Sequence, residues 1–137
     1  MTILKFSTAM FGSAPPEGLV SNPTYGHALA EMLQKEFQVL NYKTDEVIEK
    51  KDWGWCFNMM YYRQEYMIGT LAYSELNAEE NHASGQIEYL VQFDKKRTFR
   101  EMFLRQNKLK SDEPIIDLTT AILKFKIPDM TNFSKES

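Results

Sequence analysis

The stretch KDWGWCFNMMYYRQEYMIGTLAY, residues 51–73, predicts the centre of the fold. It contains both tryptophans and the only cysteine of the chain. Residues 55–62 alternate with a period of two and carry apolar side chains on both faces. This pattern indicates a central strand covered on both sides, or a strand with one face free for a partner. Arg63-Gln64 lacks the Asn-Gly or Asp-Gly preference of a tight hairpin, so the turn is predicted over Tyr62 to Glu65.

A return strand is predicted over residues 66–73. Gly69 lies inside it, and a glycine within a strand indicates either a bulge or a close approach of another group to the backbone. Here the second alternative would be a tryptophan ring lying across the strand.

The residues before this hairpin predict one strand and one helix. The strand is expected over 1–8, and residues 12–18, rich in proline and glycine, then break regular structure. Asn22 and Pro23 are typical of a helix start, because Asn caps free N–H groups and Pro suits the first helical position. The predicted helix, residues 22–40, has one apolar stripe made of Leu29, Met32, Leu33, Phe37 and Leu40. Residues 41–51 are charged and fit a short edge strand.

The residues after the hairpin predict a polar loop over 74–84, a strand ending near Phe93 and two helices. Thr98 and Glu101 fit a capping box that opens the first helix. That helix is expected to pack through one apolar side formed by Phe99, Met102 and Phe103. Glu113-Pro114 begins the last helix, whose expected packing stripe is Ile115, Leu118, Ile122 and Phe125. Pro128 ends it, and the tail 129–137 is expected to be frayed.

These elements predict an α+β fold, with an antiparallel sheet of about four to five strands packed by an N-terminal helix and two C-terminal helices. The expected divisions are a strand at 1–8, a helix at 22–40, antiparallel strands over 54–93, two helices within 98–126 and the tail. A chain of 137 residues fits one domain.

The charge is distributed unevenly along the chain. Residues 95–110 hold seven of the 16 basic residues and one acidic residue, so this segment carries +6 and the rest of the chain −9. Such a split indicates either two surfaces for different partners or one basic helix on an acidic domain. A single cysteine, no signal-peptide pattern and no apolar run near the ~20 residues of a membrane span predict a soluble, cytoplasmic protein.

No recognisable catalytic, metal or cofactor signature is present, and we expect no cofactor. His27, His82 and Cys56 lack the spacing of a structural metal site. The six glycines form no phosphate-binding loop. Cys56 is interpreted as a small buried hydrophobe. An enzymatic function would depend on Glu79, Glu80 and His82, which a solvated loop explains equally well.

Asp52-Trp53-Gly54-Trp55 opens the hairpin and is followed by the strand Tyr89-Leu90-Val91-Gln92, a short basic helix over 98–105 and a leucine-containing last helix. Over residues 50–125 this arrangement resembles a group of small, uncharacterised bacterial proteins with an acidic-Trp-Gly-Trp hairpin. The resemblance implies the same fold and a bacterial or phage source. It implies no activity and no catalytic residues.

These observations favour a non-enzymatic protein-binding module, such as an immunity protein or a phage or bacterial inhibitor that blocks a partner protein. Rigid aromatic side chains are typical interface anchors, and an acidic loop can steer toward a basic toxin or effector. The expected partner-binding residues are Asp52, Trp53, Trp55, Tyr62, Glu75, Glu79 and Glu80.

The alternative function is binding of nucleic acid or another anionic surface through the basic segment 95–110. Its expected contacts are Arg97, Arg100, Arg105 and Lys108. A sequence pI near 5.4 places this function second, because nucleic-acid-binding domains are usually basic. A small enzyme of unknown reaction is third.

Overall fold

The computed structural model describes residues 2–11, 23–73 and 87–136. The segment 12–18, the predicted helix cap Asn22 and the polar loop 74–84 lie outside the described residues. One six-stranded antiparallel sheet has the strand order β2-β3-β4-β5-β1-β6. The α+β prediction is confirmed, with more strands than expected. The elements in chain order are β1 (Thr2–Thr8), α1 (Pro23–Val39), β2 (Glu49–Lys51), β3 (Gly54–Tyr61), β4 (Gln64–Tyr73), β5 (Ile87–Lys95), α3 (Phe99–Phe103), α4 (Pro114–Lys126) and β6 (Thr131–Glu136).

The central hairpin is tighter than its sequence predicts. Tyr61 pairs with Gln64, which leaves a two-residue loop of Tyr62 and Arg63 instead of a turn extending to Glu65. Only the first loop residue, Tyr62, has a positive φ, at 56°. This pattern matches a type II′ turn, whose twist suits antiparallel strands and whose first position normally holds glycine.

The Asp-Trp-Gly-Trp sequence has a direct structural explanation. Gly54 lies so close to β4 that a Cβ atom there would overlap the carbonyl oxygen of Thr70. The ring of Trp53 lies across Gly69, where a Cβ would be 2.6 Å from Trp53 Cη2. Of the two explanations for Gly69, the structure therefore supports the tryptophan ring. Trp55 points to the opposite side of the sheet, towards α1.

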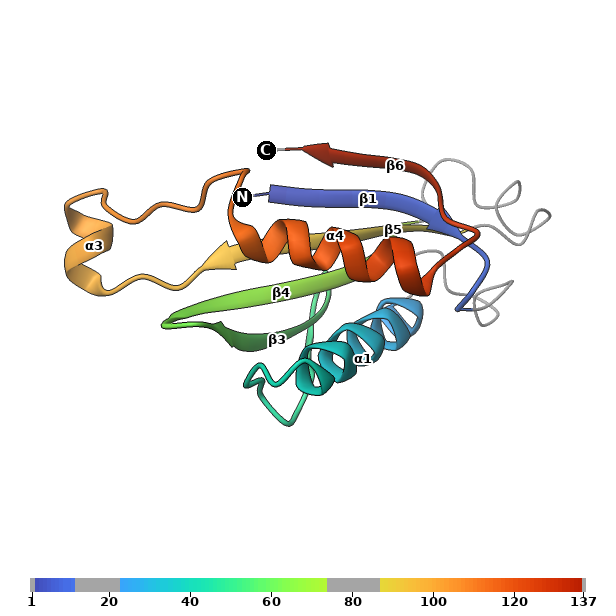
Figure 1. Ribbon diagram of the computed structural model, residues 1–137, viewed down its shortest axis with the longest axis horizontal. Coiled ribbons are helices and arrows are strands. Elements are labelled where there is room, and N and C mark those ends of the chain that lie inside the picture. Colours follow the sequence, from blue (N-terminus) through green and yellow to red (C-terminus); the bar gives the residue numbers. More distant parts are fainter. Residues whose placement is uncertain (1, 12–22, 74–86, 137) are drawn as a thin grey trace.

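Helices α1 and α4 cover the same face of the sheet (Figure 1). The N-terminal turn of α1 lies against β4, because Gly26 has no side chain and its carbonyl accepts a 2.6 Å hydrogen bond from the Thr70 hydroxyl. The predicted stripe of α1 is buried at Leu29, Leu33 and Phe37, while Leu40 is exposed. The largest buried side chains of the core are Tyr89, Phe6, Phe37, Phe57, Phe93, Leu4, Leu29, Leu33, Met59, Ile68, Ile115 and Ile116.

The packing stripe predicted for the last helix is partly wrong. Ile115 and Ile122 are buried as expected, but Phe125 is 80% exposed. The helix turns a different set of side chains toward the sheet, and Ile116, Thr119 and Leu123 are buried with Ile115 and Ile122. The packed face of α4 is therefore broader than the single stripe that a 3-4-3 repeat predicts, and the ring of Phe125 faces solvent.

The C-terminal segment, expected to be frayed, forms strand β6 next to β1 (Figure 1). Asp129 fixes the start of this strand, because its carboxylate accepts hydrogen bonds from the Thr8 hydroxyl at 2.7 Å and the Ala9 backbone at 3.2 Å. Phe133 packs against the core and lies under the ammonium group of Lys124. In the described part of the chain, no helix combines the length and apolar character needed to cross a membrane.

Candidate functional site: a projecting basic arm

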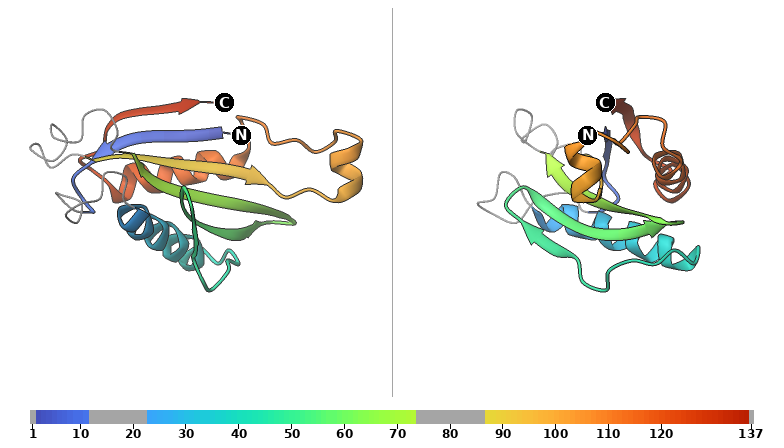
Figure 2. Two further views of the ribbon diagram at one scale, coloured as in Figure 1. Left: turned by 180° about the vertical axis from the view of Figure 1, so that it is seen from behind. Right: turned by 90° about the vertical axis from the view of Figure 1, so that its left-hand side faces the viewer.

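Between β5 and α4 the chain leaves the body of the molecule and returns, forming a projection that we call the arm, residues 96–112. Two views show the arm extending past the end of the sheet, with α3 at its tip (Figures 1 and 2). The predicted capping box is confirmed. The backbone N–H of Glu101 donates to the Thr98 hydroxyl at 3.1 Å, and the Thr98 N–H donates to the Glu101 carboxylate at 2.9 Å.

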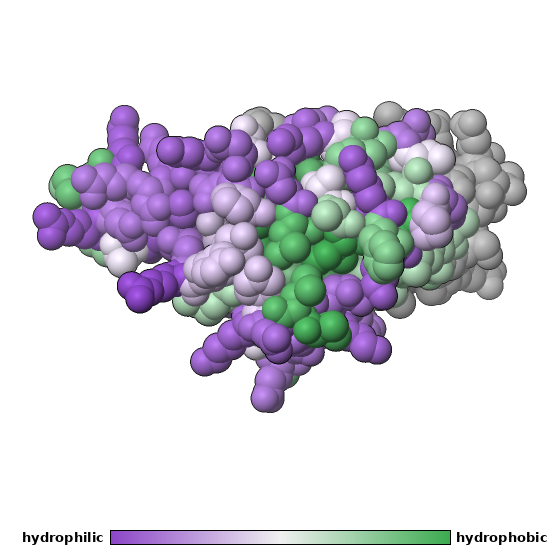
Figure 3. All heavy atoms as spheres, viewed as in Figure 1, coloured by the Kyte–Doolittle hydropathy of each residue, from purple (hydrophilic) through white to green (hydrophobic). Residues whose placement is uncertain are grey.

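The apolar side of α3 is exposed, which corrects the expectation that it packs on the body. None of the five residues of α3 is buried. Phe99 is 85% exposed and Phe103 is 78% exposed, and Met102 and Leu104 are also exposed. The space-filling view shows hydrophobic atoms at the tip of the arm among strongly hydrophilic surroundings (Figure 3). Phe99, Met102 and Phe103 follow the i, i+3, i+4 spacing, so they line one side of the helix.

The four basic residues expected to bind an anionic surface all lie on the arm. Arg100, Arg105 and Lys108 are exposed, whereas Arg97 is half-buried. The guanidinium group of Arg97 donates to the carbonyl of Gln106 at 3.1 Å, so it holds the two sides of the arm together. Arg97 therefore stabilises the arm itself, whereas Arg100, Arg105 and Lys108, together with Lys110, are exposed positive charges on the arm.

One side chain of the β3–β4 hairpin, Gln64, contacts both segments at the base of the arm. The Gln64 amide donates to the carbonyl of Lys96 at 2.5 Å and accepts a hydrogen bond from Asn107 at 2.9 Å. Gln64 therefore bonds both the outgoing and the returning segment. Because Tyr62 lies two residues before Gln64, the exposed tyrosine and the basic arm are at the same end of the molecule.

A buried ionic network lies where the arm rejoins the body. The Glu113 carboxylate accepts hydrogen bonds from the Tyr66 hydroxyl at 2.5 Å and the Lys110 backbone N–H at 2.9 Å. It also forms an ion pair with Lys95 at 3.2 Å, in which the side chains are 8% and 12% exposed respectively. Each charge in this network is therefore partnered, as burial requires. The network fixes both ends of the arm, since Lys95 precedes it and Glu113 follows it.

This network shifts two pKa values in opposite directions. Burial opposes ionisation of Glu113, but hydrogen bonds from Tyr66, Lys110 and Lys95, together with the Lys95 charge, outweigh it and lower the pKa of Glu113. Burial, and then the hydrogen bond to the Glu113 carboxylate, raise the pKa of Tyr66. At neutral pH the network therefore contains an ionised Glu113 and a protonated Tyr66.

We expect stability to fall at both ends of the pH range. A lowered folded-state pKa stabilises the protein above the ordinary carboxyl pKa of about 4.3, and this contribution is lost as pH falls through the folded value. A raised tyrosine pKa has the reverse effect, so stability is lost as pH rises above about 10. Urea denaturation from pH 2 to 11 measures both limbs. Glu113→Gln should flatten the acid limb and Tyr66→Phe the alkaline limb; unchanged limbs would contradict the assignment.

The structure separates the other residues expected to bind a partner. Asp52 and Trp53 are exposed at the β2–β3 turn, and Trp55 is half-buried against the ring of His27, with centroids 4.4 Å apart. Tyr62 is exposed at the opposite end of β3. The acidic loop residues expected to take part lie outside the described residues, namely Glu75, Glu79 and Glu80. The tryptophans and Tyr62 therefore do not form one surface.

The histidines and the cysteine were considered from the sequence as metal ligands or catalytic groups, and the structure gives this role little support. His27 pairs with Glu31 on the same helix at 2.7 Å. Cys56 is buried with a free thiol, and burial raises its pKa. Across the described ranges, no three His, Cys, Asp or Glu side chains gather in a way that could hold a metal ion. His82 lies outside those ranges.

Sequence reasoning missed the exposure of α3 and the role of Gln64 and Glu113. The high density of basic residues in segment 95–110 was a usable signal for the exposure of α3. This segment carries a net charge of +6, and charged side chains favour solvent over the core. Gln64 and Glu113 carried no such signal.

Comparison with known proteins gives no assignment. The chain matches no protein-family model, no curated protein and no solved structure.

Proposed function

We propose that this protein is a non-enzymatic binding module that acts in the bacterial cytoplasm by docking its arm on a partner protein and blocking it, as an immunity protein or inhibitor does. The observation that carries the proposal is the exposure of the apolar side of α3 at the tip of a projecting segment. Exposed aromatic side chains grouped in this way are typical of interaction sites.

The arm has the properties of a preformed docking element. The spacing of Phe99, Met102 and Phe103 matches the way an amphipathic helix inserts into an apolar groove. Gln64 and the Glu113 network hold the arm at its base, so little conformational entropy is lost on binding. Each phenylalanine ring that enters a groove contributes about 1.5–3 kcal/mol through burial of apolar surface.

The charge of the arm favours a partner whose groove is bordered by carboxylates. Arg100, Arg105 and Lys108 surround the apolar tip and would lie at the rim of such a groove, where charge mainly speeds association and selects the partner. The expectation of a basic partner, such as a toxin, depended on the acidic loop 75–80, outside the described residues. The basic arm, which the structure does describe, favours an acidic partner surface instead.

The test is to place a photo-crosslinking phenylalanine analogue at position 103 or, as a matched control, at position 125. Phe125 is as exposed as Phe103 but lies on α4, away from the arm. We expect one protein to be crosslinked in the native cell from position 103 and not from position 125. The purified partner should then bind Phe99→Ser/Phe103→Ser about 100-fold more weakly, while Phe125→Ser binds normally.

Stability provides the control for folding. Because the substituted rings are exposed, the double variant should unfold within about 0.5 kcal/mol of the original protein. Equal crosslinking from both positions, or unchanged affinity of the double variant, would contradict the proposal.

The second candidate function is binding of nucleic acid or another anionic surface. The free positive charges of Arg100, Arg105 and Lys108 favour it. It predicts that Arg100→Gln and Lys108→Gln each weaken binding to a DNA or RNA oligonucleotide and reduce its salt dependence by about one charge. Recovery of nucleic acid, and not protein, with the intact arm would favour this function.

A further inference from the structure

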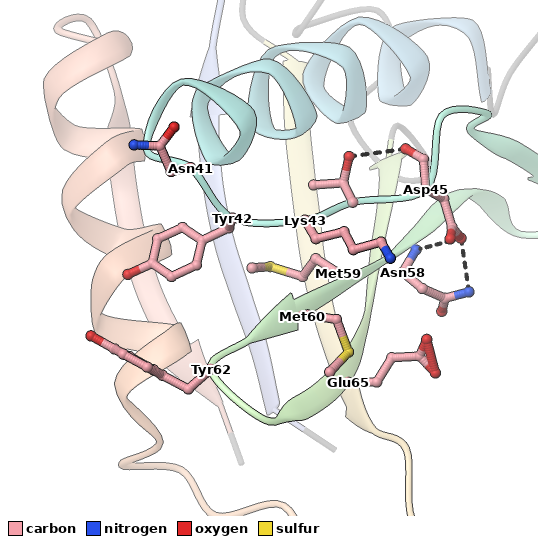
Figure 4. A pocket seen from close by; sticks show the side chains of 10 residues that line it. Asn41, Tyr42, Lys43, Asp45, Asn58, Met59, Met60, Tyr62 and Glu65 are labelled. Atoms are coloured by element: carbon pink, nitrogen blue, oxygen red, sulfur yellow. Dashed lines mark hydrogen bonds between the residues drawn. The ribbon is translucent and has the colours of Figure 1, made fainter.

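A second surface, separate from the apolar tip of the arm, lies along the outer edge of β3. Segment 41–45 runs beside this strand, with the Met60 N–H donating to the carbonyl of Lys43 at 2.8 Å and the Asp45 N–H to the carbonyl of Asn58 at 2.9 Å. The segment and the hairpin together line an open groove of about 790 Å³ (Figure 4). This volume lies within the usual range for small-ligand sites.

One end of the groove has an aromatic wall. Tyr42 and Tyr61 stack with ring centroids 5.3 Å apart, and Tyr62 stands at 88° to Tyr61 with centroids 4.7 Å apart. Tyr42 and Tyr62 line the groove, and Tyr62 is 76% exposed. Partial burial and the neighbouring hydroxyls of Tyr61 and Tyr62 raise the pKa of Tyr42. The wall therefore presents aromatic rings, and the hydroxyl of Tyr42 stays protonated at neutral pH.

The backbone at Tyr62 points to a functional role for its ring. Its φ of 56° lies in the left-handed region, which is unfavourable for a bulky side chain and normal for glycine. A glycine would also fit the two-residue turn better. A strained conformation that presents an exposed aromatic ring is a feature associated with binding sites.

The opposite end of the groove has a fixed polar pair. The Asp45 carboxylate accepts hydrogen bonds from the backbone N–H of Asn58 at 3.1 Å and its side-chain amide at 2.9 Å, through the same oxygen. Among the described residues, the other Asp45 carboxylate oxygen and the side-chain carbonyl of Asn58 remain as acceptors, and the side-chain amide of Asn58 has a second proton to donate. Figure 4 shows this pair at one end of the groove and Tyr42 and Tyr62 at the other, with Lys43, Met59 and Met60 between them.

The chemical character of the groove selects a class of ligand. A site for an anion would contain mainly hydrogen-bond donors, and a site for a cation mainly carboxylates and aromatic ring faces. This groove contains both kinds of group: Lys43 and Asn58 supply donors, and Asp45 and Glu65 supply acceptors. Between the two ends the groove is lined by the half-buried Met60, next to Met59, which is almost completely buried. A sugar ring matches this combination, because its C–H face stacks on aromatic and apolar groups while its hydroxyls both donate and accept.

We infer that this groove binds a neutral carbohydrate, with a pyranose ring stacked on Tyr62 and hydroxyls bonded to Asp45 and Asn58. This site goes beyond the proposed docking function of the arm. Failure of one leaves the other unaffected, since the carbohydrate site uses β3 and segment 41–45 and the apolar tip of the arm is formed by α3.

The experiment is an NMR titration of the full ¹⁵N-labelled chain with maltotriose, cellotriose, triacetylchitotriose and lactose, each up to about 20 mM. Tetramethylammonium and inorganic phosphate serve as charged comparison ligands. We expect saturable shifts of the amide signals of Tyr42, Asp45, Asn58 and Tyr62 with at least one neutral sugar. The expected dissociation constant is about 0.1–5 mM, as is usual for an open groove and a small ligand.

Two variants separate the ring from the backbone. Tyr62→Gly removes the ring and relaxes the turn, and we expect the sugar to bind at least about tenfold more weakly. Tyr62→Phe keeps the stacking surface and should bind within about threefold of the original. Phe103→Ser on the arm should leave sugar binding unchanged.

Three outcomes would overturn the inference. The first is the absence of shifts in the groove with every neutral sugar. The second is tighter binding of tetramethylammonium or phosphate at the same residues. The third is a Tyr62→Gly variant that binds the sugar as well as the original protein.

Discussion

Replacing Glu113 by alanine is expected to lower the free energy of unfolding by about 3–5 kcal/mol. The variant leaves the ammonium group of Lys95 buried without its partner and the Tyr66 hydroxyl without its acceptor. An unpaired buried charge costs more than the net contribution of the ion pair, so the loss exceeds that of an ordinary hydrogen bond. Chemical denaturation at neutral pH measures the difference.

Matched variants test whether this loss comes from the charge. Tyr66→Phe removes one hydrogen bond and leaves the ion pair, so it should cost only about 1–2 kcal/mol. Glu113→Gln should fall between the two, because the amide still accepts a hydrogen bond. A Glu113→Ala variant no less stable than Tyr66→Phe would show that the ion pair is solvated and that the network does not hold the base of the arm.

Gly54→Ala is expected to have the second large effect, a loss of about 2–4 kcal/mol. The new methyl group would overlap the carbonyl oxygen of Thr70, which belongs to the backbone of the neighbouring strand and cannot rotate away. Strands β3 and β4 would have to separate locally, at the start of β3. Thermal or chemical unfolding measures the loss, and retention of the full stability would mean that the two strands do not approach this closely.

Gly69→Ala is the matched control, since its new methyl group meets a side chain and not the backbone. The obstructing atoms belong to the ring of Trp53, which can swing into solvent, and to the flexible side chain of Gln92. We expect a smaller loss, about 1 kcal/mol, together with a red shift of tryptophan fluorescence as Trp53 becomes more exposed. If Gly69→Ala were as destabilising as Gly54→Ala, the Trp53 ring would be a fixed part of the sheet.

The part of the fold that could be predicted depends on interactions between close neighbours in the chain. The alternation in β5 and the Thr98–Glu101 capping box involve residues two or three positions apart, so their patterns are visible in the sequence. Strand β6 could not be found in this way. Its polar sequence has no clear alternation, and its first support is the bond from Thr8 to Asp129, 121 residues away.

The candidate sites also divide into parts that the sequence predicts and parts that it does not. The sequence pointed to the basic segment and to Tyr62 as an interface residue, because charge density and aromatic character are properties of single residues. It did not indicate the Glu113 network, which joins β4, β5 and the start of α4. It also gave no indication that Asp45 and Asn58 would meet, since that contact requires segment 41–45 to run beside β3.

By itself, the sequence determined the α+β class, the central hairpin and the helix starts, because these follow from side-chain periodicity, from capping residues and from the absence of a side chain on glycine. Only the tertiary structure decided which apolar residues are buried. Phe57 and Phe103 are the same amino acid, yet one is in the core and the other is exposed. Burial depends on what the fold brings opposite a side chain: α1 and α4 cover the face of the sheet that holds Phe57, whereas the arm carries α3 away from the body.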